Sequence, residues 1–222
     1  MNLTLVDPAL VAVVLLNFFL LATRRLRAII YGVAMQGAIL GMVYPLMHQV
    51  PGEGAANVVS VRLLGLAAAM VIIKGIVMPR MLFFAMQRTG APSKIEPYLG
   101  ITASMLLGVL ATAAVISFSA RLPLREQHSS HLLVPASLST VLIGFLILTT
   151  RREALTQVLG YLVLENGIFI FGLLLIDALP AIVELGVLLD LFVAVFVMEI
   201  ILHHVSRQFP APTSDHLSSL RE

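Results

Sequence analysis

Residues 151–177 read RREALTQVLGYLVLENGIFIFGLLLID, and this stretch decides the fold. The segment between Arg152 and Asp177 is almost entirely apolar, and about 20 such residues span the hydrocarbon core of a bilayer as a helix. Glu165 lies 13 residues after Arg152 and 12 before Asp177, which is about 18–20 Å from either end at 1.5 Å per residue. The stretch therefore predicts a membrane-spanning helix with a carboxylate near its middle.

The composition extends this interpretation to the whole chain. The 222 residues are 59% hydrophobic and 12% charged, with a mean hydropathy of +1.00, whereas soluble domains carry about 45–50% apolar and about 25% charged residues. These values exclude a soluble enzyme, and they also exclude intrinsic disorder. The chain has no cysteine, which excludes disulfides, thiolate metal sites, iron–sulfur clusters and thiol nucleophiles on it.

Apolar segments long enough to cross a bilayer recur along the chain, so we predict an all-α, polytopic membrane protein of about seven transmembrane helices. The predicted spans are 5–22, 28–47, 58–78, 98–118, 132–149, 155–176 and 182–205. The residues at the N-terminus, Met1 to Pro8, contain no Lys or Arg. We therefore expect the first span to be a retained helix and not a cleaved signal peptide.

Basic residues are unevenly distributed between the predicted loops. The second, fourth and sixth loops hold two, Arg121 and Arg125. The odd-numbered loops and the C-terminal tail hold ten: Arg24, Arg25, Arg27, Arg80, Arg88, Lys94, Arg151, Arg152, Arg207 and Arg221. Because cytoplasmic loops carry the excess of Lys and Arg, the N-terminus is predicted to lie outside and the C-terminus in the cytoplasm. The same bias explains the sequence pI of about 9.3 without a nucleic-acid partner.

The chain contains a candidate internal repeat. FFLLATRR at 18–25 recurs as FLILTTRR at 145–152, with five of the eight positions identical, and Gln36-Gly37 has a later counterpart in Asn166-Gly167, as Gly32 has in Gly160. This pattern predicts two parallel three-helix repeats joined by a linking helix, and a chance match between basic pairs that follow apolar helices is the alternative. The expected division is 1–97 for the first repeat with its cytoplasmic loop, 98–131 for the linking helix and outer loop, 132–205 for the second repeat and 206–222 for a cytoplasmic tail.

Two carboxylates are predicted to lie deep in the membrane on neighbouring helices. A charge at the centre of a transmembrane helix costs about 2.5 kcal/mol or more and is a functional hypothesis by default. Asp190 lies 11 residues after Leu179, about 16 Å into its span, a depth comparable to that of Glu165. Asn166 offers Glu165 a polar partner. Such a pair can take up and release protons, and the alternative is that both carboxylates only pack against neighbouring helices.

The remaining ionisable residues of the spans are weaker candidates for a proton relay. Lys74 lies about 9 Å from the predicted cytoplasmic edge and either extends its ammonium to that edge or faces inward as a relay partner. Glu199 and His203 are four residues apart on one helical face, which suits a proton entry pair or an interfacial pair. Glu184 is expected to be an interfacial anchor. No metal site is predicted, because the histidines of the outer loops do not cluster.

The segment Thr150 to Ala154, TRREA, followed by GYLVLENG at 160–167 and ELGVLLDL at 184–191, resembles the family of E-type membrane subunits of hydrogenase-4. Members of that family belong to the membrane arm of nickel–iron hydrogenase complexes of the formate hydrogenlyase type. They are distantly similar to the K-type subunit of respiratory complex I and the C-type subunit of multisubunit sodium/proton antiporters. On that resemblance Glu165 and Asp190 take the places of the two K-type glutamates. Two departures are Gln36 where Glu165 would be repeated and Lys74 in place of an acid.

The resemblance implies a non-catalytic membrane subunit of an oxidoreductase complex that contributes to proton translocation and energy coupling. It implies no cofactor on this chain, because the nickel–iron and iron–sulfur centres belong to partner subunits. The implied partners are antiporter-like and anchor subunits of the membrane arm and peripheral hydrogenase-like subunits. The implied location is the cytoplasmic membrane of a bacterium or archaeon.

Two other functions stay open at this point. A cation/proton antiporter subunit or small secondary carrier would use the same carboxylates, although carriers favour helices broken near the midplane. The prolines Pro45, Pro79, Pro135 and Pro180 fall near predicted span ends, which disfavours a carrier. A passive membrane scaffold for a redox assembly is the third possibility.

Overall fold

The computed structural model describes residues 3–47, 56–88, 98–122 and 131–174. The described residues are helical, and six helices are long and apolar enough to cross a membrane. The helices are α1 (Leu3–Ala22), α2 (Leu26–Met47), α3 (Ala56–Ile72) continued through a π-helical segment (Ile73–Val77) into α4 (Met78–Arg88), α5 (Ile101–Ser119), α6 (Leu133–Thr150) and α7 (Ala154–Leu173). The predicted seventh span, 182–205, lies outside the described residues, so the span count and the orientation stay predictions.

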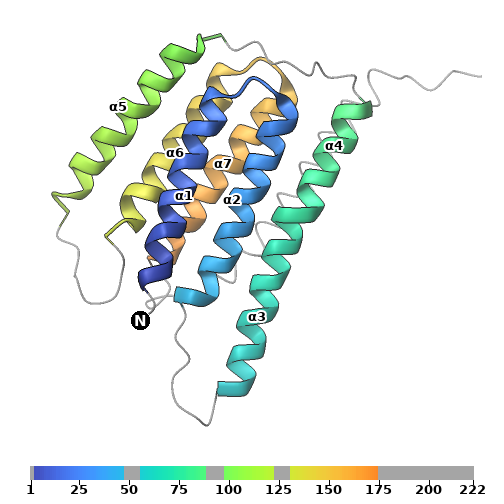
Figure 1. The fold of residues 1–222 in the computed structure, drawn as a ribbon, viewed down its shortest axis with the longest axis vertical. Helices are drawn as coiled ribbons and strands as arrows, with labels where there is room; N and C mark the ends of the chain where they lie inside the picture. The colour runs from blue at the N-terminus through green and yellow to red at the C-terminus, as the bar shows by residue number, and fades with distance from the viewer. Residues whose placement is uncertain (1–2, 48–55, 89–97, 123–130, 175–222) are drawn as a thin grey trace, which may run out of the picture.

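Among the described helices, four form the centre of the bundle and the others flank it (Figure 1). The pair α1–α2 packs against the pair α6–α7, with α5 on one side, against α1 and α6, and the helical run α3–α4 on the other, against α2. The two central pairs are the helices that carry the predicted repeat. The α1–α2 turn, the α6–α7 turn and the end of α4 lie at the same end of the bundle (Figure 1), which brings their arginines to that end.

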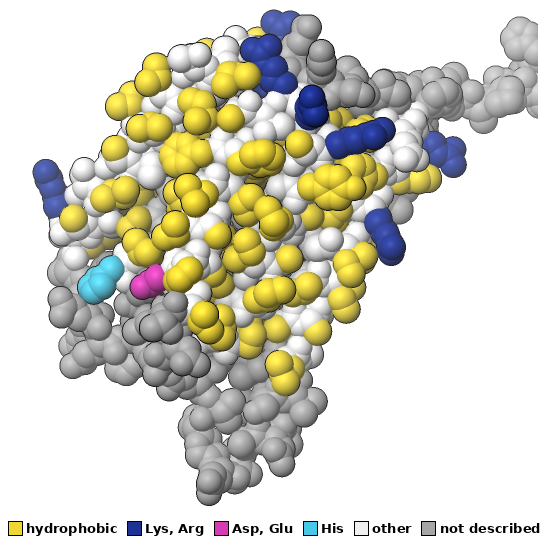
Figure 2. All heavy atoms as spheres, viewed as in Figure 1, with side chains coloured by type: hydrophobic (Ala, Val, Ile, Leu, Met, Phe, Trp, Pro, Cys, Tyr) yellow, Lys and Arg dark blue, Asp and Glu magenta, His cyan; other side chains and the backbone are white. Residues whose placement is uncertain are grey.

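The closest helix contact among the described residues joins α6 to α7 through glycines. A Cβ atom on Gly160 would lie 2.6 Å from the backbone nitrogen of Leu148, and one on Gly167 would lie 2.6 Å from that of Val141. Because transmembrane helices associate through van der Waals packing and not through the hydrophobic effect, such close backbone approach is what holds the pair together. The outer surface is apolar, as the space-filling view shows for one face (Figure 2), which suits a lipid environment.

The third span differs from its prediction at the C-terminal end. A loop was expected from Arg80, but the helix continues to Arg88. The side chains of Arg80 and Arg88 are exposed, whereas Met78, Leu82 and other apolar residues of α4 are buried. A helix tolerates arginines on its exposed face. The two arginines therefore belong to an amphipathic helix, α4, and do not end the third span.

Pro79 also lies inside this helical run and not at its end. A helical proline lacks an N–H group, and its ring clashes with the carbonyl four residues earlier. Directly before Pro79 the chain forms the π segment, in which the backbone N–H of Met78 donates to the carbonyl of Ile73, five residues back. The wider turn accommodates the proline ring, and it contains Lys74.

The glycine contact between α6 and α7 gives a first prediction. Gly160→Ala inserts a methyl group against backbone that cannot move aside, so we expect the free energy of unfolding to fall by about 1–3 kcal/mol. Gly172→Ala on the same helix is the matched control, because no described residue lies within 4 Å of a Cβ added there. The control is expected to unfold at the wild-type temperature or slightly above it. Thermal unfolding in mild detergent measures both, and equal unfolding temperatures for the two variants would contradict the packing argument.

Candidate functional site

A buried ion pair lies between the π segment and α7. The ammonium nitrogen of Lys74 is 3.3 Å from Oε1 of Glu165, and each residue is only 6% exposed. The same ammonium lies 5.5 Å from the ring centroid of Phe169, within the range of a cation–π contact. Two opposite charges removed from solvent are tolerated only when they are paired, so the two side chains depend on each other for charge compensation.

The ion pair continues into a chain of hydrogen bonds that crosses the central helices. Lys74 donates to Oδ1 of Asn166 at 3.0 Å, and Nδ2 of Asn166 donates to Oε1 of Gln36 at 3.2 Å. Nε2 of Gln36 donates to Oδ1 of Asn17 at 2.8 Å, and Nδ2 of Asn17 donates to Oγ1 of Thr140, also at 2.8 Å. These side chains come from α7, α2, α1 and α6, and all are buried. We call this series of hydrogen-bonded side chains the polar chain; its members are Asn166, Gln36, Asn17 and Thr140.

The hydrogen bonds of this polar chain all run in one sense. Each amide accepts from the side that leads to Lys74 and donates away from it. The last member, Thr140, donates to the backbone carbonyl of Ala136 at 2.6 Å. The oxygen end of every amide dipole therefore points toward the Lys74 ammonium, and such alignment stabilises the positive charge.

Lys74 packs closely against α2 and lies beside a small cavity. A Cβ atom on Gly37 would lie 2.6 Å from the Cβ of Lys74, so the absence of a side chain at position 37 lets the lysine approach α2. A cavity of about 10 Å³ lies beside Lys74, Glu165 and Asn166. A cavity of that volume has room for one water molecule, and the surrounding side chains include the polar partners that a buried water needs.

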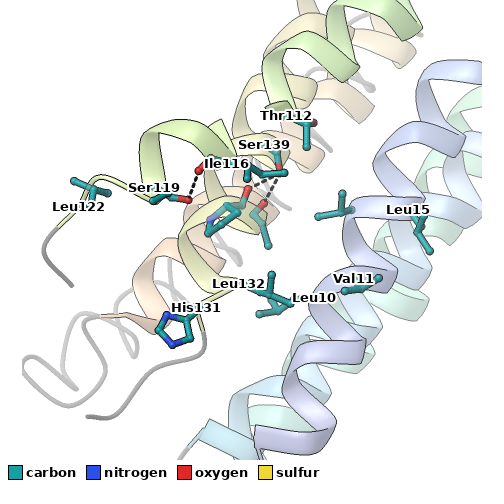
Figure 3. A pocket seen from close by; sticks show the side chains of 14 residues that line it. Leu10, Val11, Leu15, Thr112, Ile116, Ser119, Leu122, His131, Leu132 and Ser139 are labelled. Carbon is teal, nitrogen blue, oxygen red and sulfur yellow. Dashed lines mark hydrogen bonds between the residues drawn. The ribbon is translucent and has the colours of Figure 1, made fainter. Parts of the chain in front are cut away.

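A larger cavity of about 560 Å³ lies between α1, α5 and α6 (Figure 3). Its wall is largely apolar and includes Thr112, Ser139 and His131. Ala136, whose carbonyl accepts the last hydrogen bond of the polar chain, also lines this cavity. The polar chain therefore runs from the ion pair to the wall of the cavity.

The structure brings together three of the predicted relay residues. Glu165, Asn166 and Lys74 are buried and in contact, and Lys74 takes the inward of the two placements left open by the sequence. Within the described part of the chain, no group of three or more His, Cys, Asp or Glu residues is arranged to hold a metal ion. Four predicted relay residues lie outside the described residues: Asp190, Glu184, Glu199 and His203.

Sequence reasoning missed two members of the polar chain and gave no structural role to a third. Asn17 and Thr140 were not singled out, although Asn17 is the one strongly polar residue in the apolar run 9–22, and polar groups within spans are the residues that join helices. Gln36 was interpreted as the absence of a titratable group in the first half. In the structure it binds Asn166, its predicted repeat counterpart, so the two equivalent positions meet in the centre of the bundle.

Charge neutralisation tests the ion pair. Lys74→Met leaves the Glu165 carboxylate buried without its cation, and breaking a buried pair in this way costs about 3–5 kcal/mol. Lys74→Met/Glu165→Gln removes both charges, so we expect most of the lost stability to return. Thermal unfolding of the two variants in mild detergent gives the comparison. A double variant as unstable as Lys74→Met would show that the two charges do not interact.

Comparison with known proteins gives one match along nearly the whole chain and several shorter ones. The chain is 32% identical over 220 residues to "Uncharacterized protein Rv0085" of Mycobacterium tuberculosis, which covers 98% of this chain and 96% of that protein. It is 31% identical over 85 residues to "Hydrogenase-4 component E" of Escherichia coli K12, which covers 38% of this chain and 39% of that protein. The protein of that name from Shigella flexneri matches to the same extent. No family model and no solved structure matches the chain.

The partial match supports a distant relationship to Hydrogenase-4 component E, in agreement with the resemblance found at residues 150–191. The match to Rv0085 covers both proteins almost completely, and its identity is high enough to establish common membership of a family. This protein, whose described residues include six helices of membrane length, therefore belongs to the family of the Mycobacterium tuberculosis protein Rv0085.

Proposed function

We propose that this protein is a membrane subunit of a hydrogenase-4-like redox complex in which it takes part in proton relay. The observation that carries the proposal is the Lys74–Glu165 pair, buried in the bundle and joined to a polar chain across four helices. The distant similarity to Hydrogenase-4 component E supports the kind of complex. The nickel–iron and iron–sulfur centres, and the antiporter-like and anchor subunits, are then parts of the partner proteins.

The ion pair has the chemistry that a relay requires. A proton that moves from the Lys74 ammonium to the Glu165 carboxylate converts two charged groups into two neutral ones. In a site of low dielectric constant the charged and neutral forms of such a pair are closer in energy than in water, because desolvation opposes the charges. A change of charge on a neighbouring subunit can then shift the proton between Lys74 and Glu165.

The amides of the polar chain have a different part in this proposal. Asn and Gln side chains are poor proton carriers, because a neutral amide must pass through an unfavourable tautomer to transfer a proton. The oxygen ends of their aligned dipoles point toward Lys74, so Gln36, Asn17 and Asn166 act on its charge without carrying the proton themselves. The small cavity beside Lys74 and Glu165 has room for one water, which supplies the short-range contact that proton exchange needs.

One observation favours the carrier alternative. Prolines at span ends disfavour a carrier, but Pro79 lies inside the third span, next to the π segment. Interrupted helices at the site of a buried charge are typical of carriers. A cation/proton antiporter subunit is therefore the second candidate function, and a passive scaffold is the third.

Partner identification separates these functions first. Purification of the tagged protein from its native membrane in mild detergent, followed by mass spectrometry, is expected to recover subunits similar to nickel–iron hydrogenases together with antiporter-like membrane subunits. Recovery of the protein alone, or with antiporter-like subunits only, would overturn the redox-complex proposal and favour the carrier.

A charge-neutral variant then tests the relay. In Lys74→Met/Glu165→Gln both titratable groups are absent while the bundle retains its packing, so we expect the complex to assemble but proton translocation per turnover in inverted vesicles to fall at least tenfold. Glu153→Gln, which removes a carboxylate at the α6–α7 turn, is the matched control and should leave translocation unchanged. Normal translocation by the assembled double variant would rule out the relay and leave the scaffold.

A further inference from the structure

A groove begins at the α1–α2 turn and descends along the outside of α2. Its upper part, about 580 Å³, is lined by Arg24, Arg25 and Ile101, among others. Its lower part, about 520 Å³, extends past Tyr31 and Ala38. Both parts share Phe19 and Ala28 in their walls, so they form one continuous groove.

The two parts of the groove differ in polarity. Arginines lie at the upper end, where Lys and Arg side chains gather above an apolar surface (Figure 2). The lower wall consists of apolar and small residues, including Met35, Ala38 and Gly75. From Ala28 to Ala38 the groove follows ten residues of α2, about 15 Å at 1.5 Å per residue. That is about half of a 30 Å hydrocarbon core, which is the depth of one lipid leaflet.

The upper end of the groove carries positive charge that the described residues do not neutralise. None of their carboxylates forms an ion pair with Arg24 or Arg25, and Glu153 is the one described carboxylate at this end of the bundle. Arg151 adds a third cation from the α6–α7 turn. It is 2% exposed, its Nη2 donates to the carbonyl of Leu21 at 3.2 Å, and its Nη1 has no hydrogen-bond partner among the residues that the structure describes.

The electrostatics of Arg151 show how crowded these cations are. Burial lowers the pKa of its guanidinium, Glu153 raises that pKa, and the positive charge of Arg24 lowers it again. An arginine stays protonated in proteins despite such effects, so the positive charges at the two turns remain and repel one another. An anion placed beside Arg24 and Arg25 would relieve this repulsion.

The two turns differ in one position that bears on this charge. Arg151-Arg152-Glu153 supplies a carboxylate directly before α7, whereas in Arg24-Arg25-Leu26 the corresponding residue is a leucine, which is the first residue of α2. The first turn of α2 contains no acidic residue, although the N-terminus of a helix favours negative charge. The α1–α2 turn therefore lacks the anion that the α6–α7 turn carries in its own sequence.

We propose that this groove binds one anionic diacyl phospholipid, with its phosphate beside Arg24 and Arg25 and an acyl chain along α2 as far as Gly75. The combination of a cationic upper end with an apolar groove of leaflet depth matches a phospholipid and neither a free anion nor an uncharged lipid. Basic pockets between helices on the cytoplasmic side bind acidic headgroups in other membrane proteins, and this end of the bundle is the one predicted to be cytoplasmic.

Thermal unfolding of the purified protein in mild detergent, with increasing phosphatidylglycerol, tests the site. Ligand that binds the folded state raises the unfolding temperature in a saturable way. Phosphatidylglycerol is expected to raise it, whereas phosphatidylcholine and inorganic phosphate at equal concentration are expected to leave it unchanged. An equal effect of phosphatidylcholine would overturn the role of the charge, and an equal effect of phosphate would reduce the site to a free-anion site.

Charge variants locate the headgroup. In Arg24→Gln/Arg25→Gln the half-saturating concentration of phosphatidylglycerol should rise about 30-fold, since each cation near an anionic lipid contributes about 1 kcal/mol. Arg80→Gln/Arg88→Gln makes the same change of charge at the end of α4, which contributes no residue to the lining of the groove, and should retain the wild-type value. Arg24→Lys/Arg25→Lys keeps both positive charges and should recover most of the response. That recovery would show that the glutamine variant loses the response through its missing charge and not through a folding defect. Identical responses from both glutamine double variants would refute the site.

A variant that fills the groove tests the acyl chain independently of charge. Ala28→Phe places a ring at one of the two residues shared by the upper and lower parts, so the response to phosphatidylglycerol should be lost while all arginines remain. The phospholipid phosphorus that copurifies with each chain should fall in parallel. If Ala28→Phe binds and copurifies with as much lipid as the wild type, the acyl chain does not occupy the groove, and a helix of a partner subunit is the better occupant.

Discussion

The rest of the structure depends on the burial of one ammonium group. Lys74 lies in a bundle whose surroundings are almost entirely apolar, and a cation there persists only if its donors are used and its charge is compensated. Glu165 supplies the charge, Asn166 accepts a hydrogen bond, and the chain through Gln36 to Thr140 satisfies the amides in turn. Because the members of this network come from the third span and from all four central helices, one buried charge fixes how those helices are placed against one another.

The sequence predicted the apolar helices of membrane length and the place of Glu165 near the middle of one of them, because hydropathy and residue counts depend only on local sequence. It left the direction of Lys74 open for a physical reason. The rotation of a helix about its axis decides whether a side chain faces inward, and the π segment changes that rotation at residue 74 itself. The partners of Lys74 depend on which helices are neighbours, and a single sequence does not specify that at positions such as Asn17 and Thr140.

The role of Gln36 likewise depends on contacts that only the tertiary structure defines. Compared with Glu165, a glutamine on α2 indicated the loss of a titratable group, and the sequence offered no reason for an amide there. In the structure Gln36 receives a hydrogen bond from Asn166 and passes one to Asn17. A carboxylate could accept the first hydrogen bond but could not donate the second without a proton. The residue type therefore follows from its position between a donor and an acceptor, which only the tertiary structure defines.

The π segment also separates the third span into two parts with independent rotational settings. Each residue of an α-helix turns the chain by about 100°, so one extra residue in a turn displaces the buried stripe of α4 sideways relative to that of α3. The upper part packs on both α2 and α7, and the lower part packs on α2. A regular helix of the same length could bury only one continuous stripe of residues. Deletion of a single residue between 73 and 77 would therefore prevent α3 and α4 from both burying the faces that they bury now.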